Sequence, residues 1–127
     1  MIVADASWVI ALSDPVDPHH AAAVVLNRTT IDEIVVLHPV TLAECLVGPA
    51  SSGLLDEAAA SFRSAFTIAA MDAVAPLRWA ALRAATGLRL PDSIVLDTAV
   101  VGGASAILTF DRQLAVEATG RSIACPT

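Results

Sequence analysis

The sequence predicts an α/β sandwich, in which a central, mainly parallel sheet is covered by helices on both faces. Short apolar runs, often β-branched, alternate with longer segments whose apolar residues recur at helical spacing. Strands that alternate with helices in this way form parallel sheets, because each crossover places a helix against a face of the sheet. The 127 residues, 56% of them apolar, suffice for a single compact domain, 1–127, with a sizeable core.

The elements follow one another along the whole chain. Strands are predicted at the apolar runs Ile2–Ala4, Val35–Leu37, Thr67–Ala69, Ala106–Thr109 and Ser122–Ala124. Helices are predicted at the segments of helical spacing, Ser7–Leu12, His19–Thr29, Leu42–Val47, Gly53–Ser64, Ala75–Thr86, Asp92–Val101 and Arg112–Ala118. Glycines such as Gly87 and Gly120 follow helices, where they favour termination. Asp92, directly after Pro91, is a candidate N-cap.

The composition excludes several kinds of function. No apolar run approaches the roughly 20 residues that span a bilayer, and the N-terminus lacks the basic start of a signal peptide, so we expect a cytoplasmic protein with no membrane partner. All seven basic residues are Arg, and the lack of Lys excludes P-loop phosphate binding and Schiff-base catalysis. A net charge of −6 argues against a general electrostatic grip on nucleic acid. Cys45 and Cys125 form no CxxC pair and are expected to be reduced, partly buried thiols.

Two aspartates follow predicted strands. Asp5 comes directly after Ile2–Ala4, Asp111 comes shortly after Ala106–Thr109, and each precedes a helix. The carboxyl ends of parallel strands meet at one edge of a sheet, where the functional crevice of α/β proteins lies. Each aspartate could instead simply cap its helix, because Asp is favoured at that position. Two independent strand-end aspartates in one small domain favour a shared site.

Glu44 and Asp92 are the other acidic residues that stand out. Glu44 is alone on an almost wholly apolar helix, and a buried carboxylate is costly unless it is paired or bound to a metal. The alternative for Glu44 is a narrow exposed stripe on that helix. Asp92 begins a helix that is apolar for several turns, and a capping role there is compatible with a metal role.

Four carboxylates converging on one crevice would repel one another unless a cation lay between them. No His or Cys stands at zinc-ligand spacing, so the donors favour Mg²⁺, with Mn²⁺ as the other hard ion. Such an ion retains waters and binds phosphate oxygens, which indicates phosphodiester hydrolysis with one ion or two. The adjacent His19 and His20, near Asp14 and Asp17, are interpreted as a solvated turn between helices rather than a metal loop.

Four segments together closely resemble the PIN domain, specifically the VapC-type ribonuclease toxins of bacterial toxin–antitoxin pairs. They are Met1–Ile10, Thr41–Cys45, Leu90–Val95 and Leu108–Arg112, which carry Asp5, Glu44, Asp92 and Asp111. The small hydroxyl residue Ser7 after the first acid and Thr109 two residues before the last also match the family pattern, as supporting residues. Each motif alone says little, but four in order, at fitting spacing, form a strong signal.

The resemblance implies a three-layer α/β/α sandwich and binding of Mg²⁺ or Mn²⁺ by the four acids, which would also be the catalytic residues. It further implies endonucleolytic cleavage of RNA, homodimerisation and inhibition by a cognate antitoxin protein. Asp97 departs from the pattern, since the family usually has a small apolar residue there. Its side chain is rotated about 140° from that of Asp92, so we interpret Asp97 as a charge at the helix surface or at an interface, with a supporting role behind the metal ligands as the other possibility.

Arg89, three residues before Asp92, and Arg112, beside Asp111, are the candidate RNA contacts, with plain surface or salt-bridge roles as the alternative. Only five residues are aromatic and no basic–aromatic run exists, so base stacking of the kind seen in RNA-binding sheets is not indicated. The span Leu54–Phe66 has a wide apolar face, which either packs into the core or receives a dimer or antitoxin partner.

Three other functions stay open at this point. A related nuclease acting on DNA or on structured flaps would use the same site. A phosphoacceptor signalling module also uses strand-end carboxylates and Mg²⁺, but it needs a Lys that this chain lacks. A catalytically silent binding module would use the acids only as helix caps.

Overall fold

The computed structural model describes residues 1–126, and its centre is a four-stranded sheet in the order β3-β2-β1-β4. The strands are short: β1 (Ile2–Ala4), β2 (Val35–Leu37), β3 (Thr67–Ile68) and β4 (Ala106–Leu108). Each strand pairs with its neighbour in parallel, and Ile2 of β1 is in register with the first residue of both β2 and β4. The carboxyl ends of the strands therefore share one edge of the sheet.

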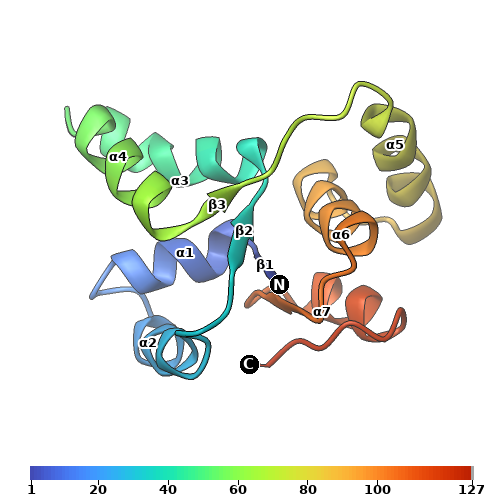
Figure 1. Ribbon diagram of the computed structural model, residues 1–127, viewed down its shortest axis with the longest axis horizontal. Helices are drawn as coiled ribbons and strands as arrows, with labels where there is room; N and C mark the ends of the chain where they lie inside the picture. Colours follow the sequence, from blue (N-terminus) through green and yellow to red (C-terminus); the bar gives the residue numbers. More distant parts are fainter. Residues whose placement is uncertain (127) are drawn as a thin grey trace.

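Helices cover both faces of the sheet, as Figure 1 shows. On one side lie the helices of the first half of the chain, α1 (Ala6–Ser13), α2 (His20–Thr29), α3 (Pro39–Ser51) and α4 (Leu55–Ala65). On the other side lie α5 (Ala75–Thr86), α6 (Leu90–Gly102) and α7 (Arg112–Thr119). The predicted three-layer α/β/α sandwich with a parallel sheet is confirmed.

The two faces have separate cores because side chains alternate along each strand. Ile2 and Ala4 of β1 pack with α1, α2 and α3, whereas Val3 between them packs with α6 and α7. In β4, Leu108 joins the first core and Ile107 the second. Every residue of β1 and β4 is buried, as expected of strands that are covered on both faces.

Some boundaries differ from the sequence prediction. The predicted strand Ser122–Ala124 forms only a single bridge, from Ala124 to Ala106. The helix predicted to end at Val47 continues to Ser51, through Pro49. Asp92 is not the N-cap of α6, because the cap position is Arg89 and Asp92 lies in the first turn. The N–H groups in the first turn of a helix have no partner within the helix, so proline, which lacks an N–H, is tolerated there. Helix α6 can therefore begin before Pro91.

No helix within residues 1–126 combines the length and the hydropathy needed to cross a bilayer. Both cysteines are free thiols, with Cys45 buried and Cys125 half-buried, as the sequence predicts. Burial, together with the nearby charges of Glu44 and Asp5, raises the pKa of the Cys45 thiol to about 12. This thiol therefore stays protonated at neutral pH and serves as packing.

Candidate active site

The crevice between β1 and β4 is the topological switch point of the sheet. The connection from β1 leads to β2 on one side of β1, and the connection from β3 brings the chain to β4 on the other side. Ligands of open α/β sheets bind outside the carboxyl ends of the strands at such a point. Asp5 directly follows β1, and Thr109 to Asp111 directly follow β4. The two strand-end aspartates thus flank the place where chemistry is expected.

Asp5 is a buried carboxylate held by two hydroxyl groups. Ser7 Oγ and Thr109 Oγ1 each donate a hydrogen bond to Asp5 Oδ2 at 2.8 Å. Each hydroxyl in turn accepts a backbone N–H from the β4–α7 turn, Ser7 from Phe110 at 3.0 Å and Thr109 from Asp111 at 2.9 Å. Asp5 stands at the N-cap position of α1, yet its side chain makes no capping bond. The cap-only alternative therefore does not apply to Asp5.

Arg89 connects the other two aspartates from the solvent side. Its Nε donates to Asp92 Oδ2 at 3.1 Å, and its Nη2 lies 3.9 Å from Asp111 Oδ2. Asp111 Oδ1 accepts the N–H of Leu114 at 2.9 Å and so caps α7, which leaves Oδ2 toward Arg89. The Asp92 side chain is 5% exposed, whereas that of Arg89 is 73% exposed. Arg89 therefore neutralises the pair while remaining free to turn away.

Glu44, half-buried on α3, belongs to the same field of charge. Burial raises the pKa of Glu44, the carboxylates of Asp5 and Asp92 raise it further, and Arg89 opposes them. Burial also raises the pKa of Asp92; the hydrogen bond from Arg89 lowers it, and the charges of Asp5 and Asp111 raise it. Neighbouring charges act in this way only over short distances. The charges of Asp5 and Asp92 thus act on Glu44, and those of Asp5 and Asp111 act on Asp92, which places the four predicted acids in one region of the molecule.

The donor set was tested against the predicted metal. Among residues 1–126, no three acidic, histidine or cysteine side chains already converge closely enough to hold an ion. The chemistry of the crevice nonetheless suits a hard divalent cation, because its donors are carboxylate oxygens and the raised pKa values of Glu44 and Asp92 reflect burial and repulsion from nearby carboxylates. Arg89 supplies positive charge at this place, and its exposed side chain can yield to an ion. The donor type, carboxylate oxygen, is the one that Mg²⁺ and Mn²⁺ prefer, whereas the spacing of the side chains is wider than a bound ion requires.

The remaining predicted residues lie at the rim. Arg112 is exposed at the first position of α7, next to Asp111. His19 lies in an exposed turn, as predicted, and stacks on Phe110, whereas His20 is the first residue of α2 and its Nδ1 lies 2.8 Å from the carbonyl oxygen of Ala11. Phe110 has no signal of its own in the sequence apart from its position between Thr109 and Asp111. The contact from His19 to Phe110 was not foreseeable, because the two residues are distant along the chain.

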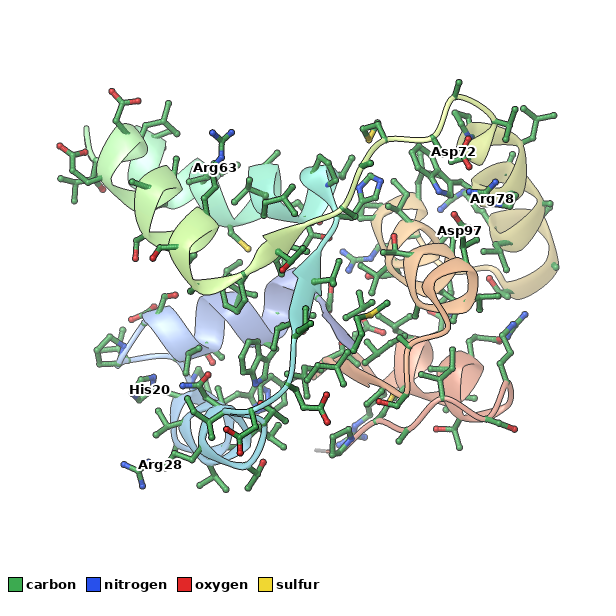
Figure 2. All side chains as sticks on the ribbon, viewed as in Figure 1. His20, Arg28, Arg63, Asp72, Arg78 and Asp97 are labelled. Carbon is green, nitrogen blue, oxygen red and sulfur yellow. The ribbon has the colours of Figure 1, made fainter. Side chains whose placement is uncertain are left out.

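Asp97 is not a surface charge, and the sequence interpretation was wrong on this point. The residue is 5% exposed and accepts hydrogen bonds from Arg78 Nε at 2.8 Å and from Trp79 Nε1 at 3.1 Å. Arg78 also contacts Asp72 at 3.0 Å, so the three labelled side chains of α5, α6 and the segment before α5 lie together in Figure 2. Helix α5 packs on α6 and covers Asp97, which local helical spacing does not reveal.

These observations agree with the comparison to protein families. The model of the PIN domain matches residues 2–118. The chain therefore belongs to the PIN domain family, a family of nucleases, as its four acidic motifs predicted. A comparison with curated proteins gives no match.

Solved structures share this fold. The Mycobacterium tuberculosis toxin VapC20, described as cleaving the sarcin–ricin loop, has a TM-score of 0.74 at 17% identity, covering 92% of this chain and 95% of its own. A toxin–antitoxin complex from Klebsiella pneumoniae gives 0.69 at 22% identity, with 87% of each chain covered. A protein from Pyrobaculum aerophilum gives 0.64 at 16% identity, with 91% and 83% covered. At these identities the likeness establishes the fold.

Proposed function

We propose that this PIN domain is a Mg²⁺-dependent endoribonuclease, also active with Mn²⁺, and that it is the toxin of a toxin–antitoxin pair. The observation that carries the proposal is the acidic crevice at the switch point of a PIN fold. Asp5 and Asp111 lie at its two strand ends, and Arg89 contacts both Asp92 and Asp111. The raised pKa values of Glu44 and Asp92 reflect burial near other carboxylates, which supports a shared site. A purely capping role does not explain Asp5, whose side chain makes no capping bond and instead accepts hydrogen bonds from two hydroxyl groups.

In this proposal the four carboxylates hold the metal ion. When bound there, Mg²⁺ would supply Lewis acidity to a phosphoryl oxygen and would lower the pKa of a water molecule. Asp5 is oriented for this role by the hydroxyls of Ser7 and Thr109, which fix Oδ2 and leave Oδ1 out of both hydrogen bonds.

Arg89 has a second use once a cation replaces it. Its guanidinium carries donors in a planar fork that matches a phosphate, and its side chain is 73% exposed beside Asp92 and Asp111. Turning outward, it would contact the RNA backbone at the mouth of the crevice. Arg112, exposed at the start of α7, would contact the same backbone from the side of Asp111.

An antitoxin and a second copy of the chain are the proposed protein partners. Helix α4 has no buried residue, so the predicted apolar face of this region is only partly used by the core. Val47, Leu54 and Leu55 are 65%, 54% and 44% exposed. Exposed apolar side chains gathered in one region favour a partner. The shared fold with a protein of a toxin–antitoxin complex supports an antitoxin as that partner.

Cleavage of labelled single-stranded RNA by the purified protein tests the function. We expect cleavage in Mg²⁺ or Mn²⁺ and none in EDTA. Asp5→Asn keeps an oxygen for the bonds from Ser7 and Thr109 but loses the charge, and it should lower the rate by more than about 100-fold, since even indirect partners of a metal contribute about 10–100-fold. The matched control is Asp32→Asn, an exposed acid in the turn between α2 and β2, which should cleave like the wild type.

Three outcomes would contradict the proposal. Intact RNA in Mg²⁺ would remove the ribonuclease assignment, and cleavage of DNA in its place would favour the DNA nuclease. Equal rates for Asp5→Asn and the wild type would remove Asp5 from the site. In cells, induced expression should arrest bacterial growth and Asp5→Asn should relieve the arrest, so equal toxicity of the two proteins would also count against the site.

A further inference from the structure

A pair of stacked rings adjoins the acidic crevice. The imidazole of His19 lies on the ring of Phe110, with centroids 4.4 Å apart and planes 9° from parallel. Phe110 stands between Thr109 and Asp111, and its N–H donates to Ser7 Oγ at 3.0 Å. The ring pair is therefore tied through the backbone to the hydroxyls that hold Asp5.

The segment that presents His19 is ordered by its own hydrogen bonds. The carboxylate of Asp17 accepts the N–H of His19 at 2.8 Å, and the carboxylate of Asp14 accepts the N–H of Val16 at 3.1 Å. The ring of His20 is bonded to the carbonyl of Ala11 at 2.8 Å, which fixes the start of α2 against α1. Figure 2 shows His20 between these two helices. A side chain held in this way loses little further freedom when a ligand stacks on it.

Phe110 and His19 occupy different depths. Phe110 is half-buried and packs against the core that α1, α2 and α3 share with the sheet, whereas His19 is exposed. Phe110 thus supports one face of the imidazole, and the exposed residue offers the other face to solvent. The remaining aromatic residues are used elsewhere: Trp8 and Trp79 are buried, and Phe62 and Phe66 pack against the core from the α4 side.

A flat, supported ring beside a phosphodiester site suits a nucleobase. Proteins bind unpaired bases by stacking them on aromatic and histidine side chains, and this attraction does not depend on positive charge. That independence matters in a chain of net charge −6, which cannot hold RNA by general electrostatics. A base within a duplex has no free face to offer, so a stacking site selects single-stranded segments or loops.

We propose that the exposed face of His19, supported by Phe110, binds one unpaired nucleobase of the RNA next to the phosphate that is cut. The inference rests on the proposed ribonuclease function and specifies its substrate class as single-stranded or looped RNA. Stacking tolerates any base, so the platform fixes where the chain enters the crevice and leaves sequence choice to other contacts.

Binding of RNA to the full chain tests the platform without requiring cleavage. A short single-stranded RNA and a series in which one nucleotide at a time is abasic are bound to the protein in EDTA at low salt, and affinity is measured by fluorescence anisotropy. The wild type should show one position at which loss of the base weakens binding by about 5- to 150-fold, the range for one stacked base. His19→Ala should bind the intact RNA as weakly as the wild type binds that abasic RNA, and should be insensitive to the abasic position.

Two further variants make the result specific to the ring. His19→Phe keeps an aromatic face and should retain the abasic position, whereas Val16→Ala, in the same turn and 87% exposed, should behave like the wild type throughout. A duplex of the same sequence should not compete. The proposal is overturned if the loss of affinity from His19→Ala and the loss from the abasic position multiply when the variant binds the abasic RNA. It is also overturned if no abasic position weakens binding by the wild type, or if the protein binds no RNA. RNA that is bound in this pattern but left intact in Mg²⁺ would overturn the nuclease function and leave the platform standing.

Discussion

Replacing Asp97 with asparagine or with leucine should destabilise the protein to different degrees, because the two side chains remove different bonds. Asp97 accepts two hydrogen bonds from Arg78, at 2.8 and 3.2 Å, and one from the indole of Trp79 at 3.1 Å. Asparagine keeps the volume and one acceptor oxygen, which can still serve Trp79. Leucine has a similar volume and accepts nothing.

The magnitudes follow from what each variant leaves unpaired. Arg78 is 35% exposed and retains Asp72 at 3.0 Å, so losing Asp97 does not strand a buried charge. We therefore expect Asp97→Asn to cost about 1–2 kcal/mol, near the low end for a hydrogen bond to a charged group. Asp97→Leu also leaves the buried indole N–H of Trp79 without an acceptor and should cost about 2–4 kcal/mol, just below the range for breaking a fully buried pair.

Urea unfolding at pH 7 measures both values from the shift in midpoint at an unchanged slope. In the background Arg78→Met the cost of Asp97→Asn should vanish or become a gain, because the ion pair is then already absent and the buried carboxylate has lost its charged partner. Asp56→Asn, an exposed acid on α4, is the control. Costs below about 0.5 kcal/mol for both Asp97 variants are typical of surface substitutions and would restore the surface interpretation that the sequence suggests.

Two further predictions concern pH. The pKa of Glu44 is raised, so the contribution of Glu44 to stability is full below its ordinary pKa of 4.5 and is lost as pH rises through the raised value. Glu44→Gln should therefore raise the melting temperature in EDTA at pH 7 and reduce the further rise that Mg²⁺ gives, unlike the control Glu57→Gln on α4. An unchanged melting temperature would contradict the assigned repulsion. Burial lowers the pKa of His38, and the charge of Asp97 opposes this with a smaller effect. The unfolded chain therefore takes up the proton first, and the free energy of unfolding should fall as pH drops below 6.5. His38→Gln should make the free energy of unfolding depend less on pH, and an equal pH dependence in both proteins would refute the cause.

The sequence predicts where the strand-end acids lie, because the geometry that positions them is local. A residue after a parallel strand must lie at the carboxyl edge of the sheet, so Asp5 and Asp111 were placed by their strands alone. Glu44 was placed by contrast with its apolar helix. Nothing local predicts Arg89 as the bridge between Asp92 and Asp111, because its contact with Asp111 depends on how α6 and α7 pack against each other.

The failures have the opposite cause. Asp97 is buried because α5, which begins 22 residues earlier at Ala75, folds over α6, and helical spacing describes only the helix on which a residue lies. Ser122–Ala124 is apolar enough for a strand, but its one bridge to Ala106 does not extend into a ladder. Helix α3 passes through Pro49, which cannot donate to the carbonyl of Cys45, because a single lost bond does not outweigh the remaining packing of α3 on α1 and α4.

The carboxylates of the crevice repel one another, so other contacts must hold the helices that carry them at a fixed separation. These contacts lie away from the crevice. Glu44 is on α3 and Asp92 on α6, in different helix layers of the sandwich. His38 caps α3 by accepting the N–H of Val40 at its Nδ1, at 3.1 Å, and its ring lies edge-on to Trp79 with centroids 5.4 Å apart. Trp79 donates to Asp97, which is on the same helix as Asp92. These contacts link the two helix layers without involving the carboxylates of the crevice. Packing therefore opposes the repulsion between those carboxylates, and their negative charge stays free to attract a cation.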